Sequence, residues 1–204
     1  MKCIIIGAGT FNEKNIPISK KDLIICADGG YIYAKNLKIK PHYLVGDFDS
    51  LETPIIDDDI IQIKANSIKD ETDIYLAIQV GLEKGYKEFY IYGGLGGRLE
   101  HTFANIQILF NLKEKGIKAI LFNENQIVEI YHNETIIFDD SYKGYISLFS
   151  YSPTSTVSIK NLKYDLENKE LTYMFPLGID NEFINKESNI IIHNGYVLSI
   201  INKK

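Results

Sequence analysis

The sequence predicts an α/β N-terminal domain, with an open, mostly parallel sheet and helices on both faces, followed by an all-β, sandwich-like C-terminal domain. Short apolar runs alternate with helical segments over residues 1–125. Several of these runs are continuously apolar, as expected for parallel strands covered on both faces. Residues 126–204 instead contain only short strand-like runs separated by turn residues. This pattern of short strands is typical of a small β-sandwich or barrel.

The first domain is expected to contain six strands, at residues 2–9, 23–28, 42–47, 60–64, 88–94 and 118–123. Two helices are predicted, at residues 70–85 and 99–116, because apolar side chains recur there every three or four positions. Both segments end in glycine, a common residue at helix C-termini. Asp70 is expected to cap the first of these helices, and Asp73 to interact with its dipole.

The second domain is expected to contain seven strands, at residues 127–132, 135–139, 145–150, 155–160, 171–175, 189–193 and 196–200. A unit of about 80 residues buries limited surface by itself. We therefore expect it to pack on the first domain or on a second copy of the protein.

Composition excludes several functional classes. The 204 residues carry a formal net charge of −5, so no basic surface indicates a nucleic-acid partner. The N-terminus lacks the long apolar region of a signal peptide, and no apolar stretch reaches membrane-span length. We therefore expect a cytoplasmic protein with no membrane partner. Cys3 and Cys26 lie in apolar runs and are expected to be buried, reduced thiols.

Carboxylates follow several predicted strands at the sheet edge where ligands of open α/β folds bind. Each has a simple structural explanation alone: a turn, a solvated loop or a helix cap. Brought together they would repel one another or protonate, and a divalent cation relieves that repulsion. Oxygen-only ligands favour magnesium. The carboxylates are Asp28, Asp47, Asp49 and Asp73, and the small or polar residues beside them are Gly29, Gly30, Ser50 and Thr72.

The segment GGLGGRLEHTFAN (93–105) follows one predicted strand and opens the second helix. Gly96 and Gly97 expose backbone N–H groups just before a helix N-terminus, which favours anion binding. Arg98 adds a forked cation suited to phosphate oxygens. His101 and Asn105 are four residues apart and share a helix face. Together with the carboxylates, this predicts a metal–nucleotide phosphate site that transfers a phosphoryl-type group.

The ordered set ADGG (27–30), GDFDS (46–50), KDETD (69–73) and GGLGGRLEHTFAN (93–105), followed by DNEF (180–183), resembles the thiamine pyrophosphokinase family over nearly the whole chain. The resemblance implies magnesium-dependent transfer of the diphosphate of ATP to the hydroxyl of thiamine, which gives thiamine diphosphate and AMP. It implies a nucleotide-binding catalytic domain at 1–125 and a thiamine-binding and dimerisation domain at 126–204. It also implies a homodimer with the site at the subunit interface.

Residue roles carried over from the resemblance are expectations for this chain. Asp47, Asp49 and Asp73 are expected to hold the metal, and Asp49, Asp73 and Arg98 to be catalytic. The expected substrate-binding residues are Asp28, Gly29, Gly30, Ser50, Thr72, Gly96, Gly97, His101, Asn105, Asp180 and Asn181.

Two positions depart from the family pattern. Glu100 stands where the family usually has aspartate, and Asp180 where it usually has serine. The chain has no tryptophan, so an aromatic ring that stacks on thiamine must belong to tyrosine or phenylalanine. Phe183 is a candidate for that contact.

Two other functions remain open on sequence grounds. A glycosyltransferase can use an Asp-x-Asp pair to bind a metal–nucleotide-sugar, but the glycine-rich motif with Arg98 and the C-terminal β domain fit it poorly. A nucleotide- or thiamine-sensing module would bind ATP without consuming it. Arg98 argues against a sensor, which has less need of a cation directed at the transferred group.

Overall fold

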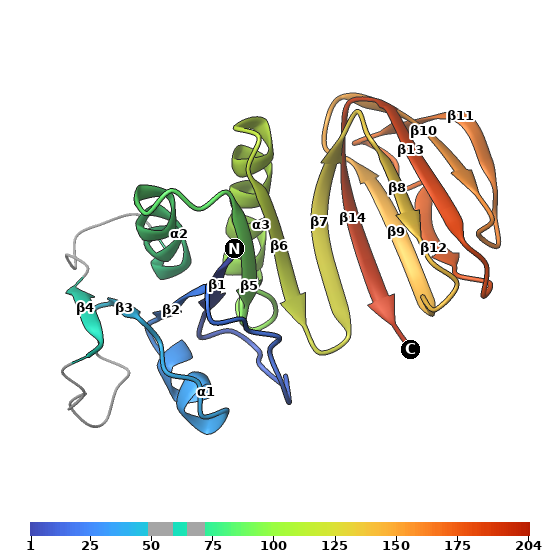
Figure 1. Ribbon diagram of the computed structural model, residues 1–204. Helices are drawn as coiled ribbons and strands as arrows, with labels where there is room; N and C mark the ends of the chain where they lie inside the picture. Colours follow the sequence, from blue (N-terminus) through green and yellow to red (C-terminus); the bar gives the residue numbers. More distant parts are fainter. Residues whose placement is uncertain (49–58, 65–71) are drawn as a thin grey trace. The chain divides into compact units, whose positions relative to one another are not determined.

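The computed structural model describes residues 1–48, 59–64 and 72–204. The chain divides into two compact units, Met1–Glu124 and Asn125–Lys204, which are described separately (Figure 1). The first contains parallel strand pairs and helices, and the second contains antiparallel pairs. None of the helices in the described part of the chain is both long and apolar enough to cross a membrane.

A parallel sheet with strand order β6-β5-β1-β2-β3-β4 forms the centre of the first unit. Its inner strands β1 and β2 are buried at every position, because their side chains are apolar on both faces. The six strands confirm the predicted ones within a few residues. Their bounds are Cys3–Ile6 (β1), Leu23–Ala27 (β2), Tyr43–Gly46 (β3), Ile61–Lys64 (β4), Glu88–Tyr92 (β5) and Lys118–Asn123 (β6).

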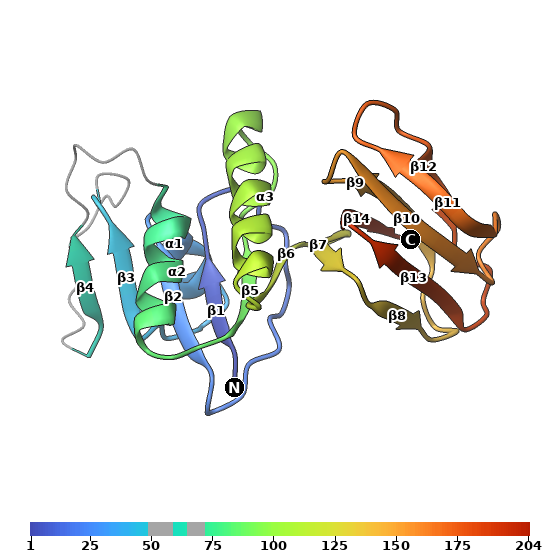
Figure 2. The ribbon, with the colours of Figure 1, turned by 90° about the horizontal axis from the view of Figure 1, so that it is seen from above.

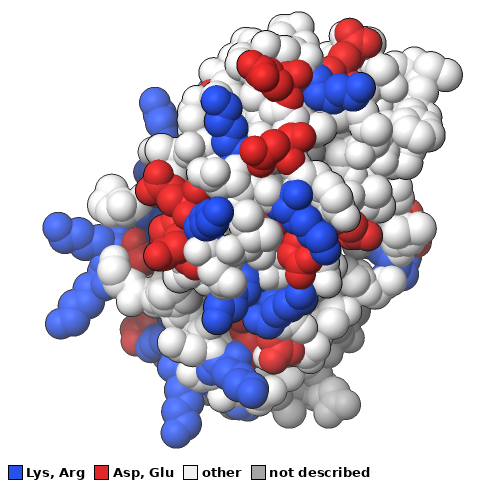
Figure 3. All heavy atoms as spheres, turned by 90° about the vertical axis from the view of Figure 1, so that its right-hand side faces the viewer, with Lys and Arg blue, Asp and Glu red and all other residues white. Residues whose placement is uncertain are grey.

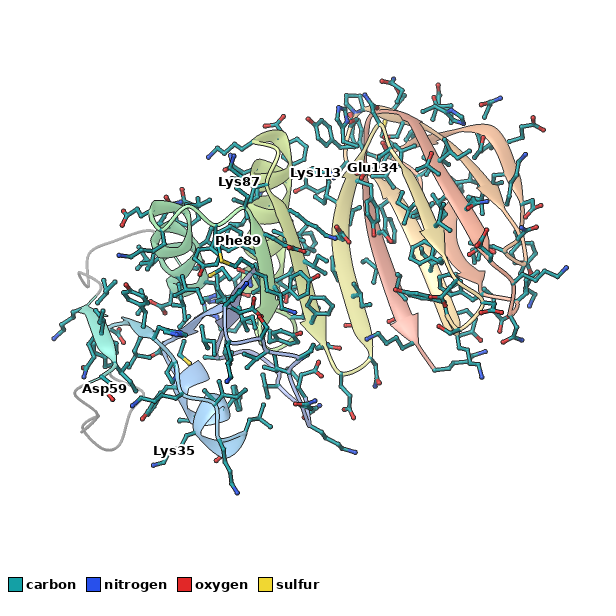
Figure 4. All side chains as sticks on the ribbon, in the orientation of Figure 1. Lys35, Asp59, Lys87, Phe89, Lys113 and Glu134 are labelled. Carbon is teal, nitrogen blue, oxygen red and sulfur yellow. The ribbon has the colours of Figure 1, made fainter. Side chains whose placement is uncertain are left out.

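Helices cover both faces of this sheet. Ala34 of α1 (Gly30–Asn36) belongs to the same buried cluster as Ile4 and Ile6 of β1. On α2 (Asp73–Glu83), Gly81 lies against the Cys3 thiol and the Phe89 ring, and Figure 4 labels Phe89 in this region. Neighbouring strand residues point to opposite faces, so α1 and α2 lie on opposite sides of β1. Helix α3 (Leu99–Glu114) contacts α2 and β6 (Figure 2).

Two details of the helices differ from the prediction. Helix α1 was not expected, because Asp28-Gly29-Gly30 indicated a turn; packing of Ala34 on the sheet outweighs the low helix propensity of glycine. The N-cap of α2 is Thr72, whose Oγ1 accepts a hydrogen bond of 3.2 Å from the Tyr75 N–H. The prediction that Asp70 caps this helix is therefore wrong, and Asp70 itself lies outside the described residues.

Gly30 allows α1 to begin directly against the end of β1. A Cβ atom at this position would lie 1.9 Å from the carbonyl oxygen of Ile6. We expect Gly30→Ala to lower the free energy of unfolding by at least about 3 kcal/mol, because a backbone atom must move to make room. Urea denaturation measures the loss. Gly116→Asn is the control, since Gly116 has open space around it and a φ of 70°, which asparagine tolerates. Equal stability losses in the two variants would contradict this account.

The two cysteines lie on opposite faces of the first sheet. Cys3 contacts the α2 side, whereas Cys26 lies in the cluster with Ala34 of α1. Burial raises the pKa of both thiols to about 12. We expect neither thiol to react with Ellman's reagent at pH 8 until the protein unfolds, because both remain protonated and covered. Stoichiometric labelling of the native protein within minutes would show this to be wrong.

The second unit contains two antiparallel sheets, with strand orders β12-β9-β14-β7 and β11-β10-β13-β8. Apolar side chains from both sheets form one core that includes Ile146, Val157 and Val197. The strand bounds are Gln126–His132 (β7), Thr135–Phe138 (β8), Gly144–Ser150 (β9), Thr154–Lys160 (β10), Leu166–Thr172 (β11), Gly178–Glu182 (β12), Ser188–Asn194 (β13) and Tyr196–Lys203 (β14).

One predicted strand of this unit, at residues 171–175, is displaced, because only its first two residues belong to a strand. Strand β11 ends at Thr172, and the apolar side chains of Tyr173, Met174 and Phe175 are exposed beyond it. β11 lies at the edge of its sheet and is mostly polar, so it lacks the apolar signature of a strand. Strand β12, which contains Asp180 and Asn181, was not expected.

Charged side chains of both signs are interspersed on the face shown in Figure 3. In the second unit, Glu182 pairs with Lys163 at 3.0 Å and with Lys204 at 2.7 Å. This mixed surface agrees with the formal net charge of −5 and shows no large basic area on the face in view.

Candidate active site

A cavity of about 650 Å³ opens in the first unit where β1, β2 and β5 end and where α2 and α3 begin. This is the edge at which open parallel sheets bind ligands. The cavity is lined by Ala8, Gly9, Ala27, Asp28, Thr72, Asp73, Ile74, Gly93, Gly94, Gly96, Gly97, Arg98, His101 and Asn105.

Main-chain atoms form one wall of the cavity. The Gly9 N–H donates to the Gly93 carbonyl at 2.8 Å, and a Cβ on Gly93 would lie 2.3 Å from the carbonyl oxygen of Gly7. Gly93 has a φ of 66°, a conformation that glycine adopts readily. Ala8 and Gly9 also line the cavity and were not predicted to do so. The signal that could have revealed them is the G-A-G triplet at 7–9, directly after the first strand.

Three of the predicted carboxylates lie near one another. Asp28 and Asp73 line the cavity. The pKa of Asp73 is raised above its usual value, first by burial and then by the negative charges of Asp28 and Asp47. His101 opposes this shift. Asp28 has a φ of 45°, which is uncommon for a residue with a side chain, and its N–H donates to the Val45 carbonyl at 2.8 Å.

The donor set is suited to magnesium, although the described residues do not form a complete metal site. Within residues 1–48, 59–64 and 72–204, no group of three or more His, Cys, Asp or Glu side chains is arranged to hold a metal ion. Asp49, one of the predicted ligands, lies outside the described residues, as does Ser50. Burial is the first cause of the raised pKa of Asp73, and the charges of Asp28 and Asp47 are the second; a hard divalent cation would relieve the repulsion among these carboxylates.

The part of the cavity next to the start of α3 is suited to an anion. Gly96 and Gly97 precede α3 with φ values of 75° and 67°, and Arg98 occupies the N-cap position of that helix. Arg98 Nε donates to Glu100 Oε1 at 2.7 Å, and both side chains are mostly exposed. The pKa of Glu100 is lowered by its own backbone N–H and then by Arg98. The contact uses Nε, so the two terminal nitrogens of Arg98 keep the geometry of a fork.

His101 and Asn105 lie on the cavity side of α3, as their spacing predicted. Asn105 is 4% exposed, and its Nδ2 donates to the Gly94 carbonyl at 2.7 Å. Thr72 also lines the cavity, where its hydroxyl caps α2. Gly30 instead packs against β1, so its clearest role is structural.

In the second unit, Asn181 is buried and holds the backbone of Tyr164. Its Oδ1 accepts from the N–H groups of Tyr164 and Glu182, both at 3.0 Å, and its Nδ2 donates to the Tyr164 carbonyl at 2.7 Å. Asp180 is exposed, has a φ of 54°, and donates its N–H to Ser147 Oγ at 3.0 Å. Whether Asp180 and Asn181 contact thiamine stays a prediction.

Phe183 is not available for stacking on a ligand. It is 7% exposed and packs edge-on against Phe138 in the core of the second unit. Tyr164, held by Asn181, is 60% exposed and is the aromatic ring next to this motif. The sequence did not single out Tyr164, because one tyrosine in a polar stretch carries no periodic signal.

Comparison with known proteins places this arrangement in a family. A model of the thiamin pyrophosphokinase catalytic domain matches residues 16–121, and a model of the thiamin pyrophosphokinase vitamin B1 binding domain matches residues 127–197. The thiamine pyrophosphokinase of Bacillus subtilis (strain 168) is 31% identical over 98% of both chains.

Solved structures agree with this assignment. The crystal structure of thiamine pyrophosphokinase from Bacillus subtilis superposes with a TM-score of 0.84 at 26% identity and covers 100% of both chains. The thiamin pyrophosphokinase from Geobacillus thermodenitrificans, at 24% identity, has the same fold with a TM-score of 0.83 over 100% of this chain and 98% of that one. The chain therefore belongs to the thiamine pyrophosphokinase family.

Proposed function

We propose that the cavity of the first unit is where this chain, an ATP-dependent enzyme that forms thiamine diphosphate, transfers the diphosphate of ATP to thiamine. The observation that carries the proposal is the arrangement of opposite charges around one cavity. Asp28 and Asp73 line it together with Arg98 and the glycines that precede α3. Carboxylates for a cation and a helix N-terminus for an anion are what a metal-bound polyphosphate requires.

Asp47, Asp49 and Asp73 would hold Mg²⁺, with Asp28 beside them. When bound, the ion would neutralise charge on the diphosphate as it is transferred. Gly96, Gly97 and Arg98 would bind the diphosphate oxygens and hold the β-phosphorus in line with the attacking oxygen. This makes positioning and electrostatics, rather than covalent catalysis, the main contribution of the protein.

In the reaction, the thiamine hydroxyl oxygen forms a bond to the β-phosphorus of ATP. The bond between that phosphorus and the oxygen bridging it to the α-phosphorus breaks, and AMP leaves with the electron pair. The hydroxyl proton is lost to a base. Asp49 and Asp73 are the candidates for this base, and a loose transition state needs little help from one.

We also propose that the two domains have the separate functions that the family resemblance implies. Residues 1–125 form the nucleotide-binding catalytic domain, with helices on both faces of an open sheet, and residues 126–204 form a sandwich-like domain for thiamine binding and dimerisation. Asp180 and Asn181 belong to the thiamine-binding part. The exposed side chains of Tyr173, Met174 and Phe175 favour an interface between two copies of the chain. We further propose that the enzyme is a cytoplasmic homodimer with its site at the subunit interface.

A direct assay tests the proposal. The protein is incubated with ATP, thiamine and Mg²⁺, and AMP and thiamine diphosphate are measured with and without EDTA. Equal amounts of both products, lost on chelation, are expected. Nucleotide binding without AMP would indicate a sensor. Consumption of a nucleotide-sugar in a parallel reaction, with no AMP from ATP, would indicate a glycosyltransferase; either result would overturn the proposal.

A further inference from the structure

The side chain of Asn105 is fixed in one orientation on the wall of the cavity. It is 4% exposed, and its Nδ2 donates to the Gly94 carbonyl oxygen at 2.7 Å. A carbonyl oxygen can only accept a hydrogen bond, so the two ends of the amide are not interchangeable here. The contact with Gly94 therefore also fixes the position of Oδ1.

In the described part of the chain, Asn105 Oδ1 has no hydrogen-bond partner, although it is buried. Buried side-chain oxygens in folded proteins are nearly always paired, because an unpaired one loses its bond to water without replacement. Since Asn105 lines the cavity, the missing donor is best supplied from within it. The other unpaired buried oxygens of the described residues, in Ser188, Asn189 and Ser199, do not line this cavity, so Asn105 is the one that a ligand in it could complete.

The chemistry of the surroundings narrows the class of donor. Asp28 and Asp73 already place negative charge in the cavity, and an ionised phosphate oxygen has no proton to donate. An uncharged amide oxygen is suited to an uncharged donor. Asn105 lies seven residues after Arg98, about 10 Å along the helix axis, so it is displaced from the residue proposed to bind the diphosphate.

We propose that Asn105 Oδ1 accepts a hydrogen bond from an alcohol hydroxyl of a bound substrate and selects for substrates that carry it. This inference rests on the proposed function, in which two substrate groups have that chemistry: the ribose of ATP and the hydroxyethyl group of thiamine. An analogue without the hydroxyl leaves this buried acceptor unpaired and therefore binds more weakly. Such a contact selects for substrates that carry the hydroxyl.

The test compares substrate discrimination in the wild type and in Asn105→Leu, which removes both polar atoms at similar volume. Asn111→Leu is the matched control, because Asn111 is exposed on the same helix. ATP is compared with 2′-deoxyATP and 3′-deoxyATP, and thiamine with the analogue in which hydrogen replaces the hydroxyl. Equilibrium dissociation constants are measured for all ligands, and kcat/KM for the nucleotides. Asn105→Ala is used if the leucine variant does not fold.

We expect the wild type and Asn111→Leu to bind one of these analogues about tenfold to a hundredfold more weakly than the natural substrate. Asn105→Leu should lose most of that preference, because the acceptor is gone. If Asn105→Leu loses the preference for ATP over a deoxynucleotide, the hydrogen-bond donor is a ribose hydroxyl. If it loses the preference for thiamine over its analogue, the donor is the hydroxyethyl group. Each ratio is measured within one protein, so a general loss of stability cancels.

The inference would be overturned if Asn105→Leu weakened binding of the natural substrates and of every analogue by the same factor. It would also be overturned if the wild type showed no preference for the natural substrates. Either result with an active wild-type enzyme would contradict this inference alone. A wild type that forms no AMP would instead contradict the proposed function.

Discussion

Asp73→Asn is expected to lower kcat about a hundredfold to a thousandfold while leaving the protein at least as stable as the wild type. The loss of activity follows because the substitution removes one of the carboxylates proposed to hold Mg²⁺, which is also one of the two candidate bases. The protein should remain folded because asparagine has nearly the same shape. AMP formation and thermal unfolding, each measured on the two proteins, check both halves of the prediction.

The expected stability of Asp73→Asn follows from the direction in which the pKa of Asp73 is shifted. Burial, Asp28 and Asp47 raise the pKa of Asp73 above its ordinary value of 3.8, so its charged form destabilises the native state. That cost is absent below pH 3.8 and grows as pH rises through the raised pKa. The asparagine side chain of the variant cannot carry the charge. The gain in the free energy of unfolding of Asp73→Asn, below about 1 kcal/mol for a half-exposed group, should therefore be seen only at pH values above the ordinary pKa of aspartate.

Asp22→Asn is the matched control, because the same substitution should have the opposite effects. Burial acts to raise the pKa of Asp22, but hydrogen bonds from the Ser19 and Lys2 N–H groups outweigh it, and the net shift is downward. Its charge therefore stabilises the native state above its ordinary pKa, and this contribution is lost as pH falls. The variant should be less stable at neutral pH but fully active. A fully active Asp73→Asn enzyme would contradict the proposed site.

Arg98→Ala is expected to lower kcat by about a thousandfold or more, and Arg98→Lys by about a hundredfold. Lysine keeps the charge but loses the fork that matches phosphate oxygens. Both variants should fold normally, since the Arg98 side chain is 72% exposed and its pairing with Glu100 contributes little stability. Steady-state kinetics with saturating thiamine and varied ATP measure the effect.

The sequence allows a second test of this residue, because Arg98 is the only arginine in the chain. Phenylglyoxal, which reacts with guanidinium groups, should inactivate the enzyme with modification at this one side chain, and ATP with Mg²⁺ should protect it. Arg98→Lys is the control and should show no arginine modification. Full activity after complete modification of Arg98 would show that the guanidinium does not contact the transferred group.

The sequence predicted the parts of the structure that depend on local pattern. The strands of the first unit are apolar runs, and Asp28 and Asp47 follow two of them, so their placement at the carboxyl edge could be anticipated. The spacing of His101 and Asn105 likewise placed both on one helix face.

Contacts between distant segments could not be predicted in this way. The amide of Asn181 holds the backbone of Tyr164, 17 residues away in the sequence, and no local pattern indicated this contact. Phe183 was a candidate for stacking, but only the packed structure shows it edge-on to Phe138. The cap of α2 at Thr72 was missed because Asp70, two residues earlier, is an equally good capping residue by type.

Gly9 and Gly93 line one wall of the cavity and Gly7 packs against Gly93, and these glycines limit how the enzyme can change. Carbonyl and amide groups belong to every amino acid, so that part of the cavity keeps its character while side chains elsewhere diverge. Replacing any of these glycines would bring a new side chain into neighbouring backbone. Efforts to alter the choice of phosphate donor by mutagenesis therefore have few positions to work with there, and new preferences will have to be built from the side chains of α2 and α3 that line the cavity.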